Sequence, residues 1–186
     1  MKKIRRIMKK RMCRYSKLLS RYVLSEKEKG VGKHVCLIIE GGKVLSYGYS
    51  NNVRTFFCGM PVSSLHSEMH AVSSLMDTEE KVFLKNNCQL HIKSFQLNRE
   101  DKKYYPIKST RRNTRRWSRR YAIICKVHWN EDGSITFMYS KPCLQCASIL
   151  YYLGIRKVVF STETGFDKIY LEREEYRPSS GIYLLK

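Results

Sequence analysis

Short apolar runs bounded by polar turns recur along most of this 186-residue chain. Alternating or continuous apolar positions over a few residues, rich in Val, Ile and aromatic side chains, are typical of strands. The runs 35–40 and 43–49 have this form, and Gly41-Gly42 between them is a two-residue hairpin signal. We expect further strands at 121–128, at 134–139 after a turn at 130–133, at 156–161 and at 182–185.

Apolar residues at helical spacing separate these strands. The first helical pattern runs from Ile4 to Val23, and the second follows residues 61–64 with Leu65, Met69 and Val72 on one face. The third begins at Pro142, a favoured first-turn residue, and stops at Gly154. We also expect a short helix at 166–176 and loops at 50–64 and 99–119, and we leave 79–98 open, with a possible strand at 88–95.

Two short motifs at the starts of the second and third helices carry the candidate chemistry. His66-Ser67-Glu68 opens one helix, and Pro142-Cys143-Leu144-Gln145-Cys146 opens the other. One imidazole and two thiolates form a three-ligand zinc set that leaves the fourth tetrahedral position open for water. Glu68 is not needed as a ligand, so it is free to move protons beside that water. The sequence therefore predicts His66, Cys143 and Cys146 as Zn²⁺ ligands and Glu68 as the catalytic residue.

A plainer alternative is that two buried cysteines and a surface histidine occur here without a metal. His70 lies four residues after His66 and offers a second imidazole on the same helix face. The two cysteines already complete the ligand set, however, so we expect His70 beside the site or on the surface.

The order H-x-E followed by P-C-x-x-C is a signature of zinc-dependent nucleobase deaminases. At these residues the chain resembles the cytidine deaminase-like superfamily, and more closely the deaminase-like proteins of fungi and large DNA viruses, from about Val35 to Gly165. The resemblance implies an α/β fold, a cytidine deaminase-like three-layer α/β/α sandwich with a mixed central sheet. It also implies hydrolytic conversion of a cytosine base to uracil with release of ammonia, as in cytidine and deoxycytidylate deaminases.

The resemblance assigns substrate binding to an asparagine that is Asn51 or, because one residue is inserted there, Asn52. Ser67 stands where the family usually has alanine, which is also small. The stretch between Glu68 and Cys143 is longer than in most relatives, so the substrate is left open among a nucleoside, a nucleotide and a base in a polynucleotide. Many relatives form oligomers, which makes a homo-oligomer an open possibility.

The net charge of +20 is concentrated in two segments. Residues 1–17 hold 9 Lys/Arg and no acid, and residues 99–120 hold 10 Lys/Arg against two acids, while the remaining 17 basic and 14 acidic residues nearly balance. We therefore divide the chain into a basic extension (1–17) and a deaminase-like domain (18–186) with a basic insertion at about 99–120.

The basic segments suit an electrostatic contact with RNA or single-stranded DNA. Tyr104, Tyr105 and Trp117 lie among the charges and offer rings for stacking on unpaired bases. Solvated loops, a nuclear address or a solubility tail are the alternative. The candidate nucleic-acid-binding residues are Arg111, Arg112, Arg115, Arg116, Arg119 and Arg120.

Seven cysteines, an odd number without a disulfide-type spacing, indicate a reducing compartment, so we expect an intracellular protein, cytoplasmic or nuclear. No apolar run approaches the roughly 20 residues of a membrane span, so we expect no membrane partner. The leading hypothesis is a zinc-dependent deaminase. The alternatives are a polynucleotide-editing deaminase and a non-catalytic, zinc-containing nucleic-acid-binding protein. Glu68 argues against the last, because zinc binding alone does not need it.

Overall fold

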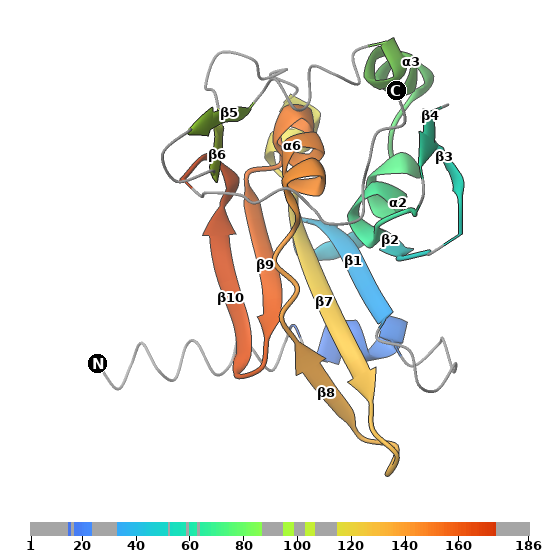
Figure 1. The fold of residues 1–186 in the computed structure, drawn as a ribbon, viewed down its shortest axis with the longest axis vertical. Helices are drawn as coiled ribbons and strands as arrows, with labels where there is room; N and C mark the ends of the chain where they lie inside the picture. Colours follow the sequence, from blue (N-terminus) through green and yellow to red (C-terminus); the bar gives the residue numbers. More distant parts are fainter. Residues whose placement is uncertain are drawn as a thin grey trace.

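A mixed sheet forms the centre of the molecule (Figure 1). The computed structural model describes residues 15, 17–23, 33–51, 53–58, 60–62, 64–86, 95–98, 103–106 and 115–173. The main sheet has six strands in the order β10-β9-β7-β1-β2, with β8 also paired to β7. These strands are β1 (Lys33–Glu40), β2 (Lys43–Tyr49), β7 (Tyr121–Trp129), β8 (Ile135–Met138), β9 (Lys157–Thr162) and β10 (Gly165–Tyr170).

The hairpin predicted at Gly41-Gly42 joins β1 to β2. Both glycines have positive φ, 57° and 82°, a conformation that costs residues with a Cβ more than glycine. On its other edge β1 pairs antiparallel with β7, and β7 pairs parallel with β9. The sheet is therefore mixed, as expected.

One edge of β7 is shared by two strands. Residues 121–124 pair with β9, and residues 126–129 pair with β8. Two buried serines hold the point where β8 and β9 separate: Ser161 Oγ donates to Met138 O at 2.6 Å, and Ser140 Oγ donates to Ile124 O at 3.0 Å. This fork directs the chain after β8 over the sheet, where α6 (Leu144–Leu153) begins.

Helices cover both faces of the sheet, as Figure 1 shows. Alternating strand residues point to opposite faces, so even-numbered β1 positions pack against one helical layer and odd-numbered positions against the other. One layer contains α2 (Ser67–Ser73), α3 (Thr78–Asn86) and α6, and the opposite layer contains Leu19 and Val23 of helical residues 17–23. The mixed α/β class is therefore confirmed.

Three local predictions are wrong. The expected loop 50–64 contains the hairpin β3 (Thr55–Phe57) and β4 (Met60–Val62). The expected loop 99–119 contains β6 (Lys103–Pro106), paired with β5 (Phe95–Asn98), and the short helix α5 (Arg115–Ser118). The expected helix 166–176 begins as strand β10 and continues into the 3-10 turn η2 (Leu171–Arg173).

The error at β10 has a simple physical cause. Phe166 and Ile169 lie three residues apart, which mimics the spacing of a helix face. In the structure they lie on opposite faces of one strand, and each contributes to a different core. The predictions for residues 1–14, 88–94 and 182–185 lie outside the described residues.

Within the described part of the chain, no helix combines the length and the apolar character needed to cross a membrane.

Candidate metal site and its cavity

The side chains of His66, Cys143 and Cys146 meet on the face of the sheet covered by α2 and α6. Their potential ligand atoms all lie within 4.8 Å of one another. His66 Nδ1 is 3.3 Å from Cys146 Sγ and 3.6 Å from Cys143 Sγ. The structure thus brings together the three residues that the sequence predicts as ligands, and this group can hold a metal ion.

Two helix starts position these ligands. His66 is the N-cap of α2 and Cys143 is the N-cap of α6, each in extended backbone geometry and neither capping its helix with its side chain. Their side chains are therefore available to the site. Cys146 follows one turn later on the same face of α6 as Cys143. Unpaired N–H groups at a helix start favour negative charge nearby, which suits a thiolate.

The ligand side chains influence one another's protonation. Hydrogen bonds from Cys146 and then His66 hold the pKa of the Cys143 thiol well below its usual range. Burial raises the pKa of the Cys146 thiol, while the hydrogen bond to Cys143 raises the pKa of His66. Cys143 is therefore the first of the two sulfurs to become negative, and binding of an ion would displace the protons that remain.

Glu68 lies beside this group without belonging to it. Its side chain is 5% exposed, and Ser67 Oγ donates a hydrogen bond to Glu68 Oε2 at 3.0 Å. Burial, followed by the negative charge of Cys143, raises the pKa of Glu68 above its ordinary value. A buried carboxyl with a raised pKa is suited to accepting and releasing a proton near neutral pH.

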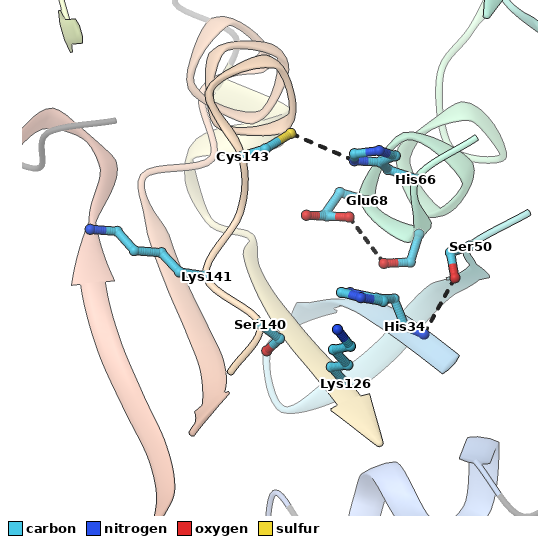
Figure 2. Close-up of a pocket in the computed structure, with 9 residues that line it drawn as sticks. His34, Ser50, His66, Glu68, Lys126, Ser140, Lys141 and Cys143 are labelled. Carbon is cyan, nitrogen blue, oxygen red and sulfur yellow. Dashed lines mark hydrogen bonds between the residues drawn. The ribbon is translucent and has the colours of Figure 1, made fainter. Parts of the chain in front are cut away.

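A cavity of about 270 Å³ opens at these residues (Figure 2). His66, Glu68 and Cys143 border one part of it, and the figure shows His34, Lys126 and Ser140 on the side toward the strands. The cavity is lined by His34, Ser50, His66, Ser67, Glu68, Lys126, Ser140, Lys141 and Cys143. An external molecule can therefore approach the three-ligand group and the Glu68 carboxyl from one space.

Strand β2 holds α2 close to the sheet. A Cβ at Gly48 would collide with Ala71 N and Ser67 O, so only a glycine permits this approach. Ser46 Oγ donates to Ala71 O at 2.7 Å, and His70 Nδ1 lies 3.2 Å from both the N and the O of Tyr49. His70 is therefore used to attach α2 to β2 and is not part of the three-ligand group.

Asn51, the predicted substrate contact, is exposed. Its backbone pairs with Leu65, and its Oδ1 accepts a hydrogen bond from Val53 N at 2.9 Å. The neighbouring Ser50 lines the cavity, whereas Asn51 is not among the lining residues. The alternative position, Asn52, lies outside the described residues. Substrate binding by Asn51 stays a prediction.

The described end of the basic insertion is attached to the core. Trp117 is fully buried and donates from Nε1 to Glu80 Oε1 at 2.7 Å, so its predicted stacking on nucleic-acid bases is wrong. Arg116 pairs with Asp77 at 3.1 Å. Arg120 is only 9% exposed, pairs with Glu40 at 3.1 Å and lies over the Trp117 ring.

These contacts divide the six candidate nucleic-acid-binding arginines. Arg116 and Arg120 bind the protein's own acidic groups, and Arg119 is exposed. Arg111, Arg112 and the side chain of Arg115 lie outside the described residues, as do the side chains of Tyr104 and Tyr105. A polyanion contact by this segment stays a prediction.

Sequence reasoning missed the cavity residues His34, Ser50, Lys126, Ser140 and Lys141. Alternation along β1 does place His34 on the same face as Cys36, and alternation along β7 places Lys126 on the same face as Ile124. What the sequence did not supply is the register that pairs His34 with Lys126.

No protein-family model, curated protein sequence or solved structure matches this chain significantly.

Proposed function

We propose that this chain is a zinc-dependent hydrolytic deaminase that converts a cytosine base to uracil and ammonia. The observation that carries this proposal is that His66 and Cys143, two members of a one-nitrogen, two-sulfur donor group, line the same cavity as the buried carboxyl of Glu68. A purely structural metal site would be closed by four protein ligands and would need no separate carboxyl.

The donor group fits zinc. Usual Zn–N and Zn–S bond lengths in a tetrahedral site separate nitrogen from sulfur by about 3.5 Å. The separations of 3.3 and 3.6 Å from His66 Nδ1 to the two sulfurs lie on either side of this value. Thiolates and imidazole also favour zinc over the oxygen-preferring magnesium and calcium. A zinc ion held here would offer an open ligand position and lower the pKa of a water molecule bound there.

Glu68 is assigned the proton transfers. Its carboxylate would accept a proton from the attacking water and deliver it to the ring nitrogen N3 of cytosine, and would then move the second water proton to the departing amino group. The reaction consumes one water and releases one ammonia. Ser67 donates a hydrogen bond to Oε2 and so orients the carboxylate, and burial raises the pKa of Glu68, which favours holding a proton between the two transfers.

The fold proposal is a cytidine deaminase-like three-layer sandwich. It is supported by the mixed sheet, by helices on both faces and by metal-ligand candidates at the starts of two helices on one face. The motifs H-x-E and P-C-x-x-C supply the link to deaminase chemistry.

Ammonia release by zinc-loaded protein tests the proposal, with cytidine, its monophosphate and cytosine-containing oligonucleotides as substrates. We expect turnover of at least one of them. Glu68→Gln should keep the zinc and the fold but lose at least about 10²–10⁴-fold in rate, because the acid–base group is gone. Glu79→Gln, an exposed carboxyl on α3, is the matched control and should leave the rate unchanged. Glu68→Gln activity within about tenfold of wild type would exclude this acid–base role.

A further inference from the structure

The strand side of the cavity carries two basic side chains. His34 of β1 and Lys126 of β7 are direct partners across the antiparallel strand pair, and both line the cavity. Figure 2 shows the His34 ring and the Lys126 ammonium group on the same side of the cavity, reaching toward the region of Glu68. Lys141, the other lysine of the lining, extends away from Glu68 in the same view.

These two groups face each other without an acidic partner. Among the described residues, no carboxylate lies within ion-pair distance of Lys126, and the His34 ring nitrogens have no hydrogen-bond partner. A positive charge on His34 directly opposite Lys126 would be unfavourable. Here burial, followed by the charge of Lys126, lowers the pKa of His34 to about 4. Near pH 7 the His34 imidazole is therefore neutral and can donate a hydrogen bond, and an anion would compensate the charge of the Lys126 ammonium group.

A hydroxyl group stands beside the basic pair. Ser50 Oγ accepts a hydrogen bond from the backbone N–H of His34 at 3.3 Å, and Ser50 also lines the cavity. Within the described part of the chain, the Ser50 hydroxyl has no acceptor of its own. The cavity lining thus offers three potential donors to a bound anion: an ammonium group, an imidazole and a hydroxyl.

We propose that His34, Lys126 and Ser50 bind the phosphate of the substrate, so that the protein acts on a cytosine mononucleotide in preference to the free nucleoside. The identity of the base rests on the proposed deaminase function, whereas the anion site rests on the geometry of the cavity wall. A phosphate monoester fits because its oxygens accept several charge-assisted hydrogen bonds at once.

The size of the cavity favours a small molecule over a polynucleotide. Its volume of about 270 Å³ lies just below the ~300–1,000 Å³ range of small-molecule sites. One nucleotide has both groups that this space would bind: a base at Glu68 and the three-ligand group, and a phosphate at His34 and Lys126.

The kinetic test compares cytidine, cytidine 5′-monophosphate and a short cytosine oligonucleotide as substrates of zinc-loaded protein. Lys126→Met should lower kcat/KM for the mononucleotide by about 10- to 100-fold, the usual range for loss of one charged hydrogen-bond partner. The same substitution should leave kcat/KM for cytidine within a few-fold of the wild-type value. Lys126→Arg should retain the preference for the mononucleotide. Lys43→Met is the control: it removes the same charge from the hairpin end of β2 and should change kcat/KM for neither substrate.

If Lys126→Met lowered kcat/KM equally for cytidine and for its monophosphate, the phosphate site would be overturned, because Lys126 would then act on the chemistry or on folding. Faster, Lys126-dependent turnover of the oligonucleotide would overturn the assignment to a mononucleotide. If no substrate reacts, the proposed deaminase function fails. The anion site is then tested separately, by measuring phosphate binding.

The binding test is calorimetric titration of zinc-loaded wild type, Lys126→Met and His34→Gln with inorganic phosphate and with cytidine 5′-monophosphate. We expect both ligands to bind the wild type and to bind Lys126→Met at least about tenfold more weakly. His34→Gln should weaken binding less, because glutamine keeps an N–H donor. Equal phosphate affinity in wild type and Lys126→Met would overturn the site, since the anion would then be bound elsewhere, for example by the metal.

Discussion

At the residue scale, the two thiols of the candidate metal site behave differently although they lie one helical turn apart. Cys143 has a lowered pKa because it accepts hydrogen bonds from Cys146 and His66, and Cys146 has a raised pKa because it is buried. Burying a negatively charged thiolate away from water is unfavourable unless its charge is compensated. A divalent ion bound between the two sulfurs would compensate both thiolates, so metal binding and stability should be linked.

Cys143→Ser should therefore lose zinc. Serine keeps the size of the side chain but replaces a soft thiolate with a hydroxyl that does not ionise at neutral pH. We expect near-stoichiometric zinc in the wild type by metal analysis and a large loss in the variant, together with a lower melting temperature. Cys58→Ser is the control, because Cys58 lies outside the three-ligand group. Full zinc retention in Cys143→Ser would refute the ligand assignment.

The lowered pKa of His34 predicts a pH-dependent stability. The pKa of His34 is about 4 in the folded chain, lowered from 6.5 by burial, then by the charge of Lys126 and then by that of His66. Glu68 borders the same cavity. Between these two pH values the unfolded chain binds a proton that the folded chain does not, so the free energy of unfolding falls as the pH falls from about 6.5 to 4.

His34→Gln should flatten this part of the pH profile, since glutamine does not titrate. The measurement is the urea midpoint of wild type and variant at pH 7 and pH 5. We expect the difference between the two pH values to be smaller in the variant. Identical pH dependence in both proteins would show that His34 titrates in the folded state as it does in the unfolded state.

The ligand candidates and Glu68 could be predicted from the sequence because residue type and short-range spacing identify them. His66 and Glu68 occur within three residues, and Cys143 and Cys146 within four. His34 and Lys126 could not be predicted as a pair, because only the register between β1 and β7 brings them together.

At the element scale, the close contact between β2 and α2 positions both His66 and Glu68. Gly48 allows the backbone of β2 to approach Ser67 and Ala71, and the Ser46 side chain adds a hydrogen bond to α2. The ligand geometry therefore depends on a residue that takes no part in the chemistry.

Gly48→Ala should displace α2 and weaken the metal site. The added methyl group meets backbone atoms, which cannot move aside as a flexible side chain can. Overpacking of this kind typically costs about 1–3 kcal/mol, and we expect a lower urea midpoint together with weaker zinc retention against a chelator. Wild-type stability and zinc affinity in this variant would show that α2 does not need this close contact.

Elements were predictable where their apolar pattern was unambiguous. The strands at 35–40 and 43–49 and the helix ending at Gly154 have long patterns and clear boundary residues, and the structure has all three. The hairpin β3–β4 is too short to show a period, since each of its strands has three residues.

At the scale of the whole molecule, part of the positive charge in the basic insertion is paired within the protein itself. Arg116 and Arg120 form ion pairs with Asp77 and Glu40 and help to bury Trp117 against the core. Sequence composition alone does not distinguish such internal pairs from charges available to a partner, because the acidic residues that bind them lie far away in the chain.

Internal ion pairs and the proposed contact with a polyanion predict different effects of charge removal. Replacing Arg111, Arg112, Arg115 and Arg119 with glutamine should weaken binding to single-stranded RNA and flatten its salt dependence, because fewer counterions are released. Arg120→Gln should instead lower the free energy of unfolding by about 1–3 kcal/mol, since it leaves Glu40 without its partner. Filter binding at several salt concentrations and urea unfolding measure the two effects. Absence of RNA binding by the wild type at low salt would refute the polyanion role.

In the proposed reaction, water replaces an amino group on a cytosine base at this site. The most direct measurement is mass spectrometry of the product formed by zinc-loaded protein in ¹⁸O-labelled water, with cytidine and cytidine 5′-monophosphate as substrates. We expect a uracil product that carries one oxygen atom from water and an equal amount of ammonia, and formation of both products at least about 100-fold slower with Glu68→Gln. Unlabelled product, or unchanged substrate in the presence of fully zinc-loaded, folded protein, would contradict it.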